Sequence, residues 1–466
     1  MRLTLFTATA CVLTVIALAI QGGRQSTGAT ASPGTEVKKA SEPAGAPATL
    51  AGKLIVHEWG TFTSFSGSDG IRLEFRPLAD EDLPPFVLDR FLQAGVPNFS
   101  KSQIRVRMRM ETPVTYFYTD RERDLEVKVA FPEGLLTEFY PPVESMQPDF
   151  NLGERPPIKD SLLDWGRIHL IPTDRLQAQV DDPVRRQLLE SRMAAGLLPQ
   201  ADTNNHYFHA RETDSAIVEV RRSKHELKEP FAPQGEFFEK FLFYRGVGNF
   251  ELPLKLTCLS DGQFELVNSG ADAFDSLFLV DIVGEQVRFS QVDQIPANGR
   301  LVLMQSTEST TTDKLEASIV AALVGHGLYE KEARAMVNTW KSSWFGEQGT
   351  RLLYAVPQSI TDKLLPLSIS PPPDQTIRVL IGRLEIMTSA DEARVTKLVR
   401  SSASARKAAI IVANQAGKPF EFAWPAELKR LGRLVEPALV RVSKVSEDPT
   451  VRLEARMLLK TLDQRE

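Results

Sequence analysis

The sequence predicts an α+β protein of several domains, rich in β-strands as far as about residue 305 and increasingly helical beyond it. Between residues 236 and 304, at least five short apolar runs are separated by Gly, Asn or Asp, which is typical of an antiparallel β-sandwich. After Thr312 the apolar residues recur at helical spacing. The chain has 466 residues, of which 42% are hydrophobic, so it is long enough for about three domains with sizeable cores.

The N-terminus predicts export from the cytoplasm. Arg2 precedes residues 3–20, which carry no charge and contain a small-x-small cleavage motif at 17–19. Because a stretch of this length is also the lower limit for spanning a bilayer, the alternative is an uncleaved membrane anchor. Residues 21–52 are rich in Gly, Ala, Ser, Thr and Pro and predict a disordered linker. We therefore expect a periplasmic protein or one that faces outward from a membrane anchor.

Net charge limits the kinds of partner that we expect, and cysteine content limits the kinds of reactive site. The net charge is −5, which argues against nucleic acid as a partner of the whole surface. Cys258 is the one cysteine outside residues 3–20, and it lies in an apolar run without a nearby His or helix start. We therefore expect Cys258 to be a small buried apolar residue rather than a nucleophile. We expect the partner to be a protein or a glycan of the cell envelope.

Residues 53–150 predict the first β-rich region. A Ser-Asp-Gly turn at 68–70 lies between two apolar runs and predicts a hairpin. A later strand alternates apolar residues with Arg105, Arg107 and Arg109. Three arginines on one strand face either bind an anionic ligand, such as an acidic polysaccharide, or pair with acidic neighbours on a solvated face. We expect the arginines to pair with acidic neighbours on a solvated face, because charged residues on a strand face are more often arranged in this way.

The middle of the chain predicts three further regions. Residues 151–203 form a helical or irregular insertion, in which 181–198 have helical spacing with Pro183 near the start. A β-sandwich region at 204–305 and an α/β region at 306–388 follow.

Three aromatic residues mark one helix of the α/β region. Trp340, Trp344 and Phe345 continue the apolar face of a helix that starts near residue 330. Such residues either lie in the core or form an exposed platform on which sugars stack. Because they extend one apolar stripe, the pattern favours a buried core.

A cluster of imidazoles and carboxylates lies at 206–214, HYFHARETD. His206, His209 and Glu212 are spaced by three, so on a helix they would share one face and could hold Zn²⁺, Mn²⁺ or Fe²⁺. On a strand, His206 and His209 would point to opposite sides. The β-like run after residue 214 favours a strand or loop as much as a helix. The alternative is therefore a partly buried strand whose histidines bond to their neighbours.

His57 and Glu58 are further candidate residues. Adjacent side chains on a strand point apart, so at most one of them faces a given pocket. If one met residues 206–214 in space, His57 would complete a mixed metal centre, with Glu58 or Asp214 as the general base. This set predicts a metal-dependent hydrolase of extracellular polymers. The competing function is non-catalytic binding or scaffolding at the cell envelope, which export, linker, sandwich and C-terminal helices favour.

Residues 389–466 predict a small helical tail. A capping box begins at Thr388, and Asp448 followed by Pro449 starts a later helix. Residues 428–462, which include LGRLVEPAL and DPTVRLEARMLLKTL, resemble one to one and a half HEAT-type repeats. Fewer than three such repeats do not make a stable solenoid alone. We therefore expect this tail to dock on the preceding domain or to cap a partner surface.

Four segments resemble a family of large exported bacterial proteins: HEWGTFTS at 57–64, METPVTYFY at 110–118, ARETD at 210–214 and EKFLFYRGVGNF at 239–250. The resemblance covers most of residues 53–388 and implies one shared architecture there. It implies no catalytic residue, because the family has no established activity. Residues 251–304 separately resemble an immunoglobulin-like sandwich of the kind appended to bacterial envelope proteins, which usually binds or spaces.

Overall fold

The computed structural model describes residues 50–78, 82–91, 101–148, 157–172, 196–200, 205–222, 234–260, 262–420 and 422–463. All of them lie in one compact unit, Ala44–Glu466. The expected signal or anchor at 3–20, the linker as far as residue 49, and the expected helix at 181–198 apart from its last three residues lie outside the described part. Within the described part, no helix combines the length and the apolar character needed to cross a membrane.

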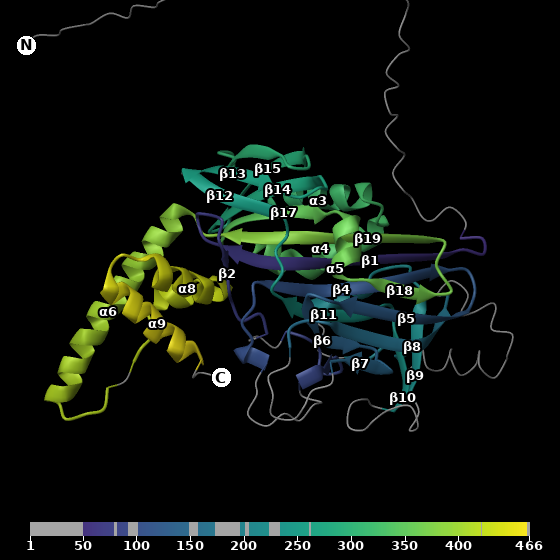
Figure 1. Ribbon diagram of the computed structural model, residues 1–466, viewed down its shortest axis with the longest axis horizontal. Coiled ribbons are helices and arrows are strands. Elements are labelled where there is room, and N and C mark those ends of the chain that lie inside the picture. Colours follow the sequence, from purple (N-terminus) through teal and green to yellow (C-terminus); the bar gives the residue numbers. More distant parts are fainter. Residues whose placement is uncertain are drawn as a thin grey trace, which may run out of the picture. The chain divides into compact units, whose positions relative to one another are not determined.

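A ten-stranded mixed sheet forms the centre of the molecule (Figure 1). Its strands are β1 (Leu54–Ser66), β2 (Arg72–Leu73), β3 (Leu88–Asp89), β4 (Met108–Thr119), β6 (Gly134–Tyr140), β11 (Leu242–Gly248), β14 (Phe274–Val283), β15 (Gln286–Ile295), β17 (Gly349–Val356) and β19 (Gln375–Ile386). They follow the order β15-β14-β17-β19-β1-β4-β11-β6-β3, and β2 forms the expected hairpin with β1. The β1 strand is parallel to β19 and antiparallel to β4, and it pairs with both. It is buried along its whole length because both faces of the sheet are covered.

Two smaller sheets pack on one face of the large sheet. The first contains β5 (Arg123–Phe131), β7 (Ser145–Gln147), β8 (Ser161–Ile171), β9 (Ile217–Arg222), β10 (Gly235–Glu239) and β18 (Leu367–Ser370); the second contains β12 (Leu254–Ser260), β13 (Gln263–Asn268) and β16 (Arg300–Met304). Val127 of β5, Leu266 of β13 and Val56 of β1 belong to one buried apolar core. This layered arrangement of mixed sheets confirms the prediction of a β-rich protein.

Residues 251–304 do not fold as a separate sandwich. The strands β14 and β15 belong to the ten-stranded sheet, where β14 pairs with β17, and the other three strands form the small sheet. A turn lies at 296–299, where the Gly299 N–H donates to the Pro296 carbonyl at 3.0 Å. The Pro, Asn and Gly residues of this segment therefore form a turn, as their turn propensities favour. The pairing of β14 with β17 was not predicted, because β15, β16, α3 and α4 separate these two strands in the sequence.

Helices cover the opposite face of the large sheet. They are η3 (His206–Arg211), α3 (Thr312–Gly325) and α4 (Glu330–Phe345), with α5 (Gln358–Leu364) and η1 (Lys101–Gln103) as short additions elsewhere. Their apolar side chains form a second core with Trp59 and Tyr116 of the sheet. Trp340, Trp344 and Phe345 are all buried in it, which confirms the prediction of an aromatic core.

The C-terminal region is helical, as predicted. It contains α6 (Ser389–Gln415), α7 (Ala426–Lys429), η4 (Gly432–Leu434), α8 (Val435–Val445) and α9 (Pro449–Asp463). The capping box is present, with the Asp391 N–H donating to Thr388 Oγ1 at 3.1 Å. The helices share a third core with Phe65 of β1, Phe75 and Met387. They therefore dock on the end of the large sheet.

Candidate functional site

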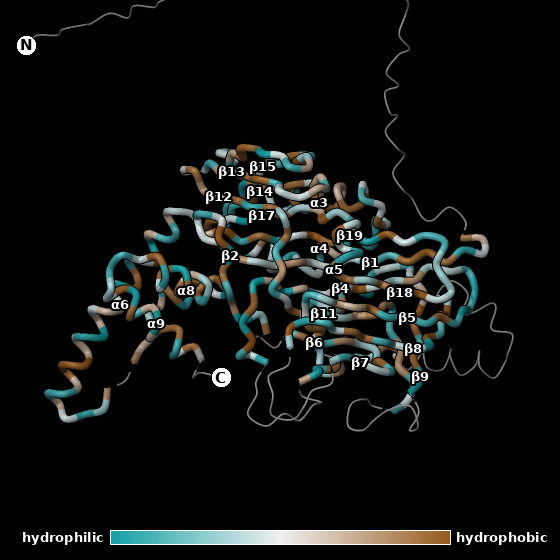
Figure 2. The backbone as a smooth tube through the Cα atoms, viewed as in Figure 1, coloured by the Kyte–Doolittle hydropathy of each residue, from teal (hydrophilic) through white to brown (hydrophobic). Residues whose placement is uncertain are grey.

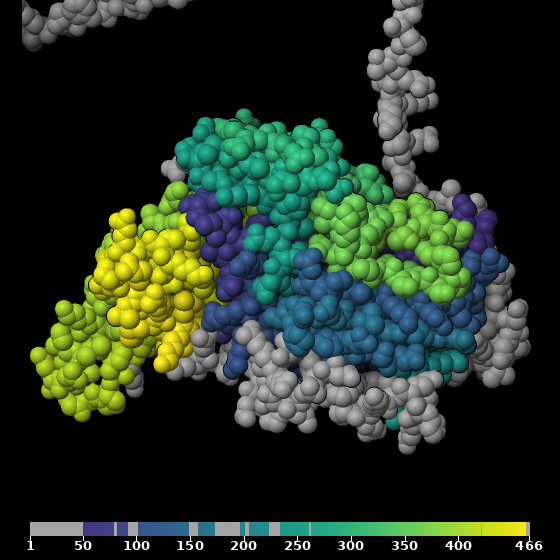
Figure 3. Space-filling view, viewed as in Figure 1, coloured from purple at the N-terminus to yellow at the C-terminus, as the bar shows by residue number. Residues whose placement is uncertain are grey.

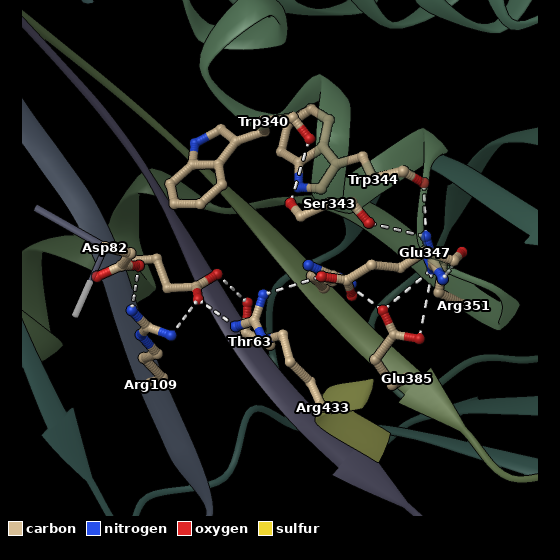
Figure 4. Close-up of polar contacts among 12 residues, drawn as sticks. Thr63, Asp82, Arg109, Trp340, Ser343, Trp344, Glu347, Arg351, Glu385 and Arg433 are labelled. Atoms are coloured by element: carbon tan, nitrogen blue, oxygen red, sulfur yellow. Dashed lines mark hydrogen bonds and ion pairs between the residues drawn. The ribbon is translucent and has the colours of Figure 1, made fainter. Parts of the chain in front are cut away.

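A row of buried and half-buried charges crosses the face of the large sheet that the helices cover. It contains the cations Lys101, Arg109, Arg245, Arg351, Arg383 and Arg433 and the carboxylates Asp82, Asp89, Glu111, Glu138, Glu347 and Glu385. We call this set the charge row. Figure 4 shows its central part, with Trp340 and Trp344 of α4 beside it.

The register of the strands explains why these side chains lie together. Arg383 of β19 and Arg109 of β4 both pair with Thr63 of β1, one on each side. Farther along the sheet, Glu138 of β6 is opposite both Arg245 of β11 and Asp89 of β3. Directly opposed residues in neighbouring strands project from the same face. Strand register therefore builds the row in two parts, on β19-β1-β4 and on β11-β6-β3. Between them Arg109 is opposite Val247, and Asp82 joins the parts by bonding to both Arg109 and Arg245.

Glu111 is the centre of the row. Its Oε1 lies 3.1 Å from Arg109 Nη1 and 2.7 Å from Nη2 of Arg433, which follows α7. Its Oε2 accepts a hydrogen bond of 2.7 Å from the Thr63 hydroxyl. Arg109 also bonds to Asp82 at 2.9 Å. Glu111 thus joins the sheet to the C-terminal helical region.

The row continues from Arg433 to the end of α4. Arg433 Nη1 lies 3.4 Å from Glu347, which also bonds to Arg383 at 2.6 Å. Arg383 and Arg351 share Glu385, at 2.6 and 3.0 Å. Arg351 in turn donates to the main-chain carbonyls of Ser343 and Trp344. These bonds satisfy carbonyl groups that a helix end leaves free, and they fix α4 against the sheet.

The electrostatics of the row suit binding better than proton transfer. Burial raises the pKa of Glu111, but Arg433, Arg109 and Arg383 outweigh burial and lower that pKa from 4.5 to about 2. Burial also opposes ionisation of Glu138, yet Arg245 and Lys101 lower its pKa to about 2. A general base works best when its pKa lies near the operating pH. Both carboxylates therefore serve as fixed hydrogen-bond acceptors at neutral pH.

Glu111 should make the protein sensitive to acid within a defined window. Since its folded pKa is depressed, the stability that it adds is present above pH 4.5 and is lost as the pH falls to about 2. A shift of this size corresponds to about 3 kcal/mol. Urea unfolding of the wild type and Glu111→Gln at several pH values measures it. We expect the gap in unfolding free energy between the two proteins to shrink across this window, and parallel curves would contradict the assignment.

His57 and Glu58 point to opposite faces of β1, as predicted. His57 Nδ1 lies 2.6 Å from Glu332 Oε2 of α4, and the pair is buried. Glu58 is buried on the other face, where Arg378 Nε donates to it at 2.7 Å and the Tyr244 hydroxyl also donates. Arg378 neutralises Glu58, so this carboxylate is not placed to act as a general base on a ligand.

The 206–214 segment divides between the interior and the surface. Its first six residues form η3, and the His206 ring lies 5.8 Å from the Trp340 ring. Burial lowers the pKa of His206, although nearby Asp82 opposes this shift. His209 and Glu212 are exposed and pair with each other at 2.9 Å.

The predicted metal set is not gathered into one site. Asp214 pairs with Lys331 on the surface at 2.7 Å, and His57 pairs with Glu332 rather than with residues 206–214. Across the described ranges, no three His, Cys, Asp or Glu side chains are grouped so that they could hold a metal ion. His206 alone among the candidates lies beside the charge row, where Asp82, Arg245, Arg109 and Glu111 influence it.

The three arginines predicted on one strand face have different environments. β4 begins only at Met108, so Arg105 and Arg107 precede the strand. Arg107 pairs with Glu251 on the surface, as expected, whereas Arg105 pairs with the buried Glu436. Arg109 is instead only 4% exposed and belongs to the charge row. An arginine within an otherwise buried strand was the one sequence signal that pointed to this site.

A groove with a volume of about 600 Å³ lies where the charge row reaches the C-terminal helices. Its apolar lining residues are Ile386, Met387, Val395, Leu398, Leu431, Leu434 and Ala438. Its charged lining residues are Glu347, Asp391, Arg394, Glu427, Arg430 and Arg433. We call it the C-terminal groove. Sequence reasoning missed it because its walls come from three separate segments, near residues 346–349, 386–398 and 427–438.

Comparisons with known proteins name no family for this chain. No family model matches it, and no curated protein matches it. Among solved structures, it is similar to the yeast delta-COP-I mu-homology domain complexed with a Dsl1 WxWxV peptide, at 7% identity and a TM-score of 0.22, over 72% of this chain and 96% of that one. A second structure of the yeast domain matches at 9% identity with the same coverage and TM-score. A TM-score this low supports no statement about fold or function.

Proposed function

We propose that this chain is an exported protein of the cell envelope that binds a partner protein through the C-terminal groove and does not catalyse a reaction. The apolar segment at 3–20 supports export. The groove is the observation that carries the binding role, because its volume of about 600 Å³ lies within the range of roughly 300–1,000 Å³ that is usual for ligand sites. Its apolar lining residues offer contact area, and its charged ones can orient a ligand.

The ion pairs formed by the candidate catalytic carboxylates favour a binding function over hydrolysis. Glu58 is held by Arg378, and Asp214 lies on the surface with Lys331. The strongly lowered pKa of Glu111 leaves it unsuited to proton transfer at neutral pH. Each of these groups therefore acts in an ion pair.

The lining of the groove favours a protein segment over a glycan. Its lining residues, all in the described part, include no Trp, Tyr or Phe on which a sugar ring could stack. Leu431, Met387 and Leu398 offer an adaptable apolar floor for aliphatic side chains. At the rim, Glu427 and Arg430 are exposed and have opposite charges, which suits the donors and acceptors of a peptide backbone.

The charge row orders the C-terminal groove in the unbound protein. Arg433 lies in the groove wall and bonds to both Glu111 and Glu347, so one wall is tied to the sheet. A site that is ordered in advance loses less conformational entropy on binding. This rigidity links the buried row to recognition.

Selection from a random peptide library displayed on phage, with residues 44–466 as the target, tests this function. We expect enriched peptides to share an apolar anchor residue. Their affinity, measured by fluorescence polarisation, should fall at least tenfold in Leu431→Arg, which fills the floor, and in Arg430→Glu, which reverses a rim charge. Val302→Arg changes an exposed apolar residue on β16 and is the matched control. Peptides that bind all three variants equally would reject the groove as the site.

A further inference from the structure

The second half of α6 carries an exposed apolar segment. Ile410, Ile411 and Val412 are 38%, 49% and 63% exposed. The buried residues of this helix, Val395, Val399 and Ser402, all lie in its first half. Figure 3 shows α6 extending away from the other C-terminal helices, and Figure 2 shows hydrophobic residues in the extended part. Apolar clusters that face water in this way usually mark an interaction surface.

The three apolar residues do not form a stripe for a single partner helix. Consecutive residues on an α-helix are about 100° apart, so Ile410, Ile411 and Val412 together cover more than half of the circumference. A helix-helix seam is narrower and repeats every three or four residues. This distribution suits immersion of the helix end in an apolar medium.

Positive charges predominate in the sequence around this segment, which Glu421 follows. Residues 393–420 contain Arg394, Lys397, Arg400, Arg406, Lys407 and Lys418 and no Asp or Glu. The arginines pair with Asp391, Asp448 and Glu454. The lysines are exposed, and none of them pairs with an acidic side chain among the residues that the structure describes. Exposed lysines beside an exposed apolar segment attract anionic lipid headgroups and can place the apolar side chains in the interface.

We propose that the end of α6 docks on an anionic lipid surface. Ile410, Ile411 and Val412 would enter the interface, and Lys407 and Lys418 would lie over the phosphate headgroups. Phe420, which is exposed just beyond the helix, adds an aromatic group at the same end. Association of two copies through this helix would bring its cations together, and like charges repel. Charge complementarity therefore selects the lipid surface.

Flotation with lipid vesicles tests the proposal. The protein is residues 44–466, which contain every described element and lack the apolar segment at 3–20. We expect it to float with vesicles that contain phosphatidylglycerol and not with pure phosphatidylcholine vesicles. Each lysine near such a surface contributes about fivefold to binding, so Lys407→Gln/Lys418→Gln should bind roughly thirtyfold more weakly.

Two further variants separate the apolar contribution from general surface effects. Ile411→Gln/Val412→Gln should reduce flotation at least tenfold while circular dichroism stays unchanged, because both residues are exposed. Val302→Gln/Met304→Gln removes a similar exposed apolar area on β16 and should float like the wild type.

Three results would overturn the proposal. They are equal flotation with neutral and anionic vesicles, wild-type flotation of the Lys407→Gln/Lys418→Gln and Ile411→Gln/Val412→Gln variants, and a dimer in analytical ultracentrifugation that Ile411→Gln/Val412→Gln abolishes. The last would assign this face to a second copy. Leu431→Arg, which blocks the C-terminal groove, should still float, so failure here is distinguishable from failure of the proposed binding function.

Discussion

Replacing Glu111 by glutamine is expected to lower the free energy of unfolding by about 3–5 kcal/mol, because it removes one partner from a buried ion pair. The substitution preserves shape but leaves Arg109 without one of its two carboxylates. Arg433 keeps only its longer contact with Glu347. Each buried or half-buried cation then loses part of its compensation, and this loss costs more than the pair itself contributes to stability.

Urea unfolding at pH 7, followed by far-UV circular dichroism, measures this loss. The matched control is Arg107→Gln, whose pair with Glu251 has side chains that are 43% and 50% exposed. An exposed pair of this kind contributes about 0–1 kcal/mol. Equal losses in Glu111→Gln and Arg107→Gln would show that the charge row has no special structural role.

A chain that ends at Thr388 is expected to aggregate rather than fold into a soluble protein. The removed helices cover Phe65, Leu73, Phe75 and Met387, which are almost completely buried in the whole protein. An exposed cluster of this size favours association. The truncation also removes Arg433, which leaves Arg109 as the remaining cation bonded to Glu111.

Size-exclusion chromatography of residues 44–388 tests this expectation. Co-expression of residues 389–466 should restore a soluble complex if docking of the two parts is what matters. A monomeric chain of residues 44–388 with unchanged strand content would contradict the view that the C-terminal helices complete the fold.

Local sequence patterns predicted much of the secondary structure. The hairpin of β1 and β2, the capping box at Thr388 and the buried Trp344 each depend on residues that are close in sequence. Residue spacing and turn chemistry decide such features. The opposite directions of His57 and Glu58 followed from strand geometry in the same way.

Long-range pairing explains what the sequence did not show. Glu111 and Arg433 are 322 positions apart, and Glu58 and Arg378 are 320 apart. A single sequence gives no sign that such residues meet. For the same reason it did not indicate that β14 joins β17, or that three distant segments enclose a groove. The spacing within 206–214 was a weaker guide, because η3 ends at Arg211 and Glu212 lies at its cap.

Photo-crosslinking in cells that express the protein tests most directly whether the C-terminal groove binds a partner protein. A benzophenone amino acid is placed at position 431 in the groove. We predict an adduct with one defined protein that is lost when Arg430→Glu is added, and whose purified partner binds residues 44–466 but not Leu431→Arg. The same probe at Val302 should give no such adduct. Absence of an adduct at position 431, or the same adducts at both positions, would contradict the proposal that this groove binds a partner protein.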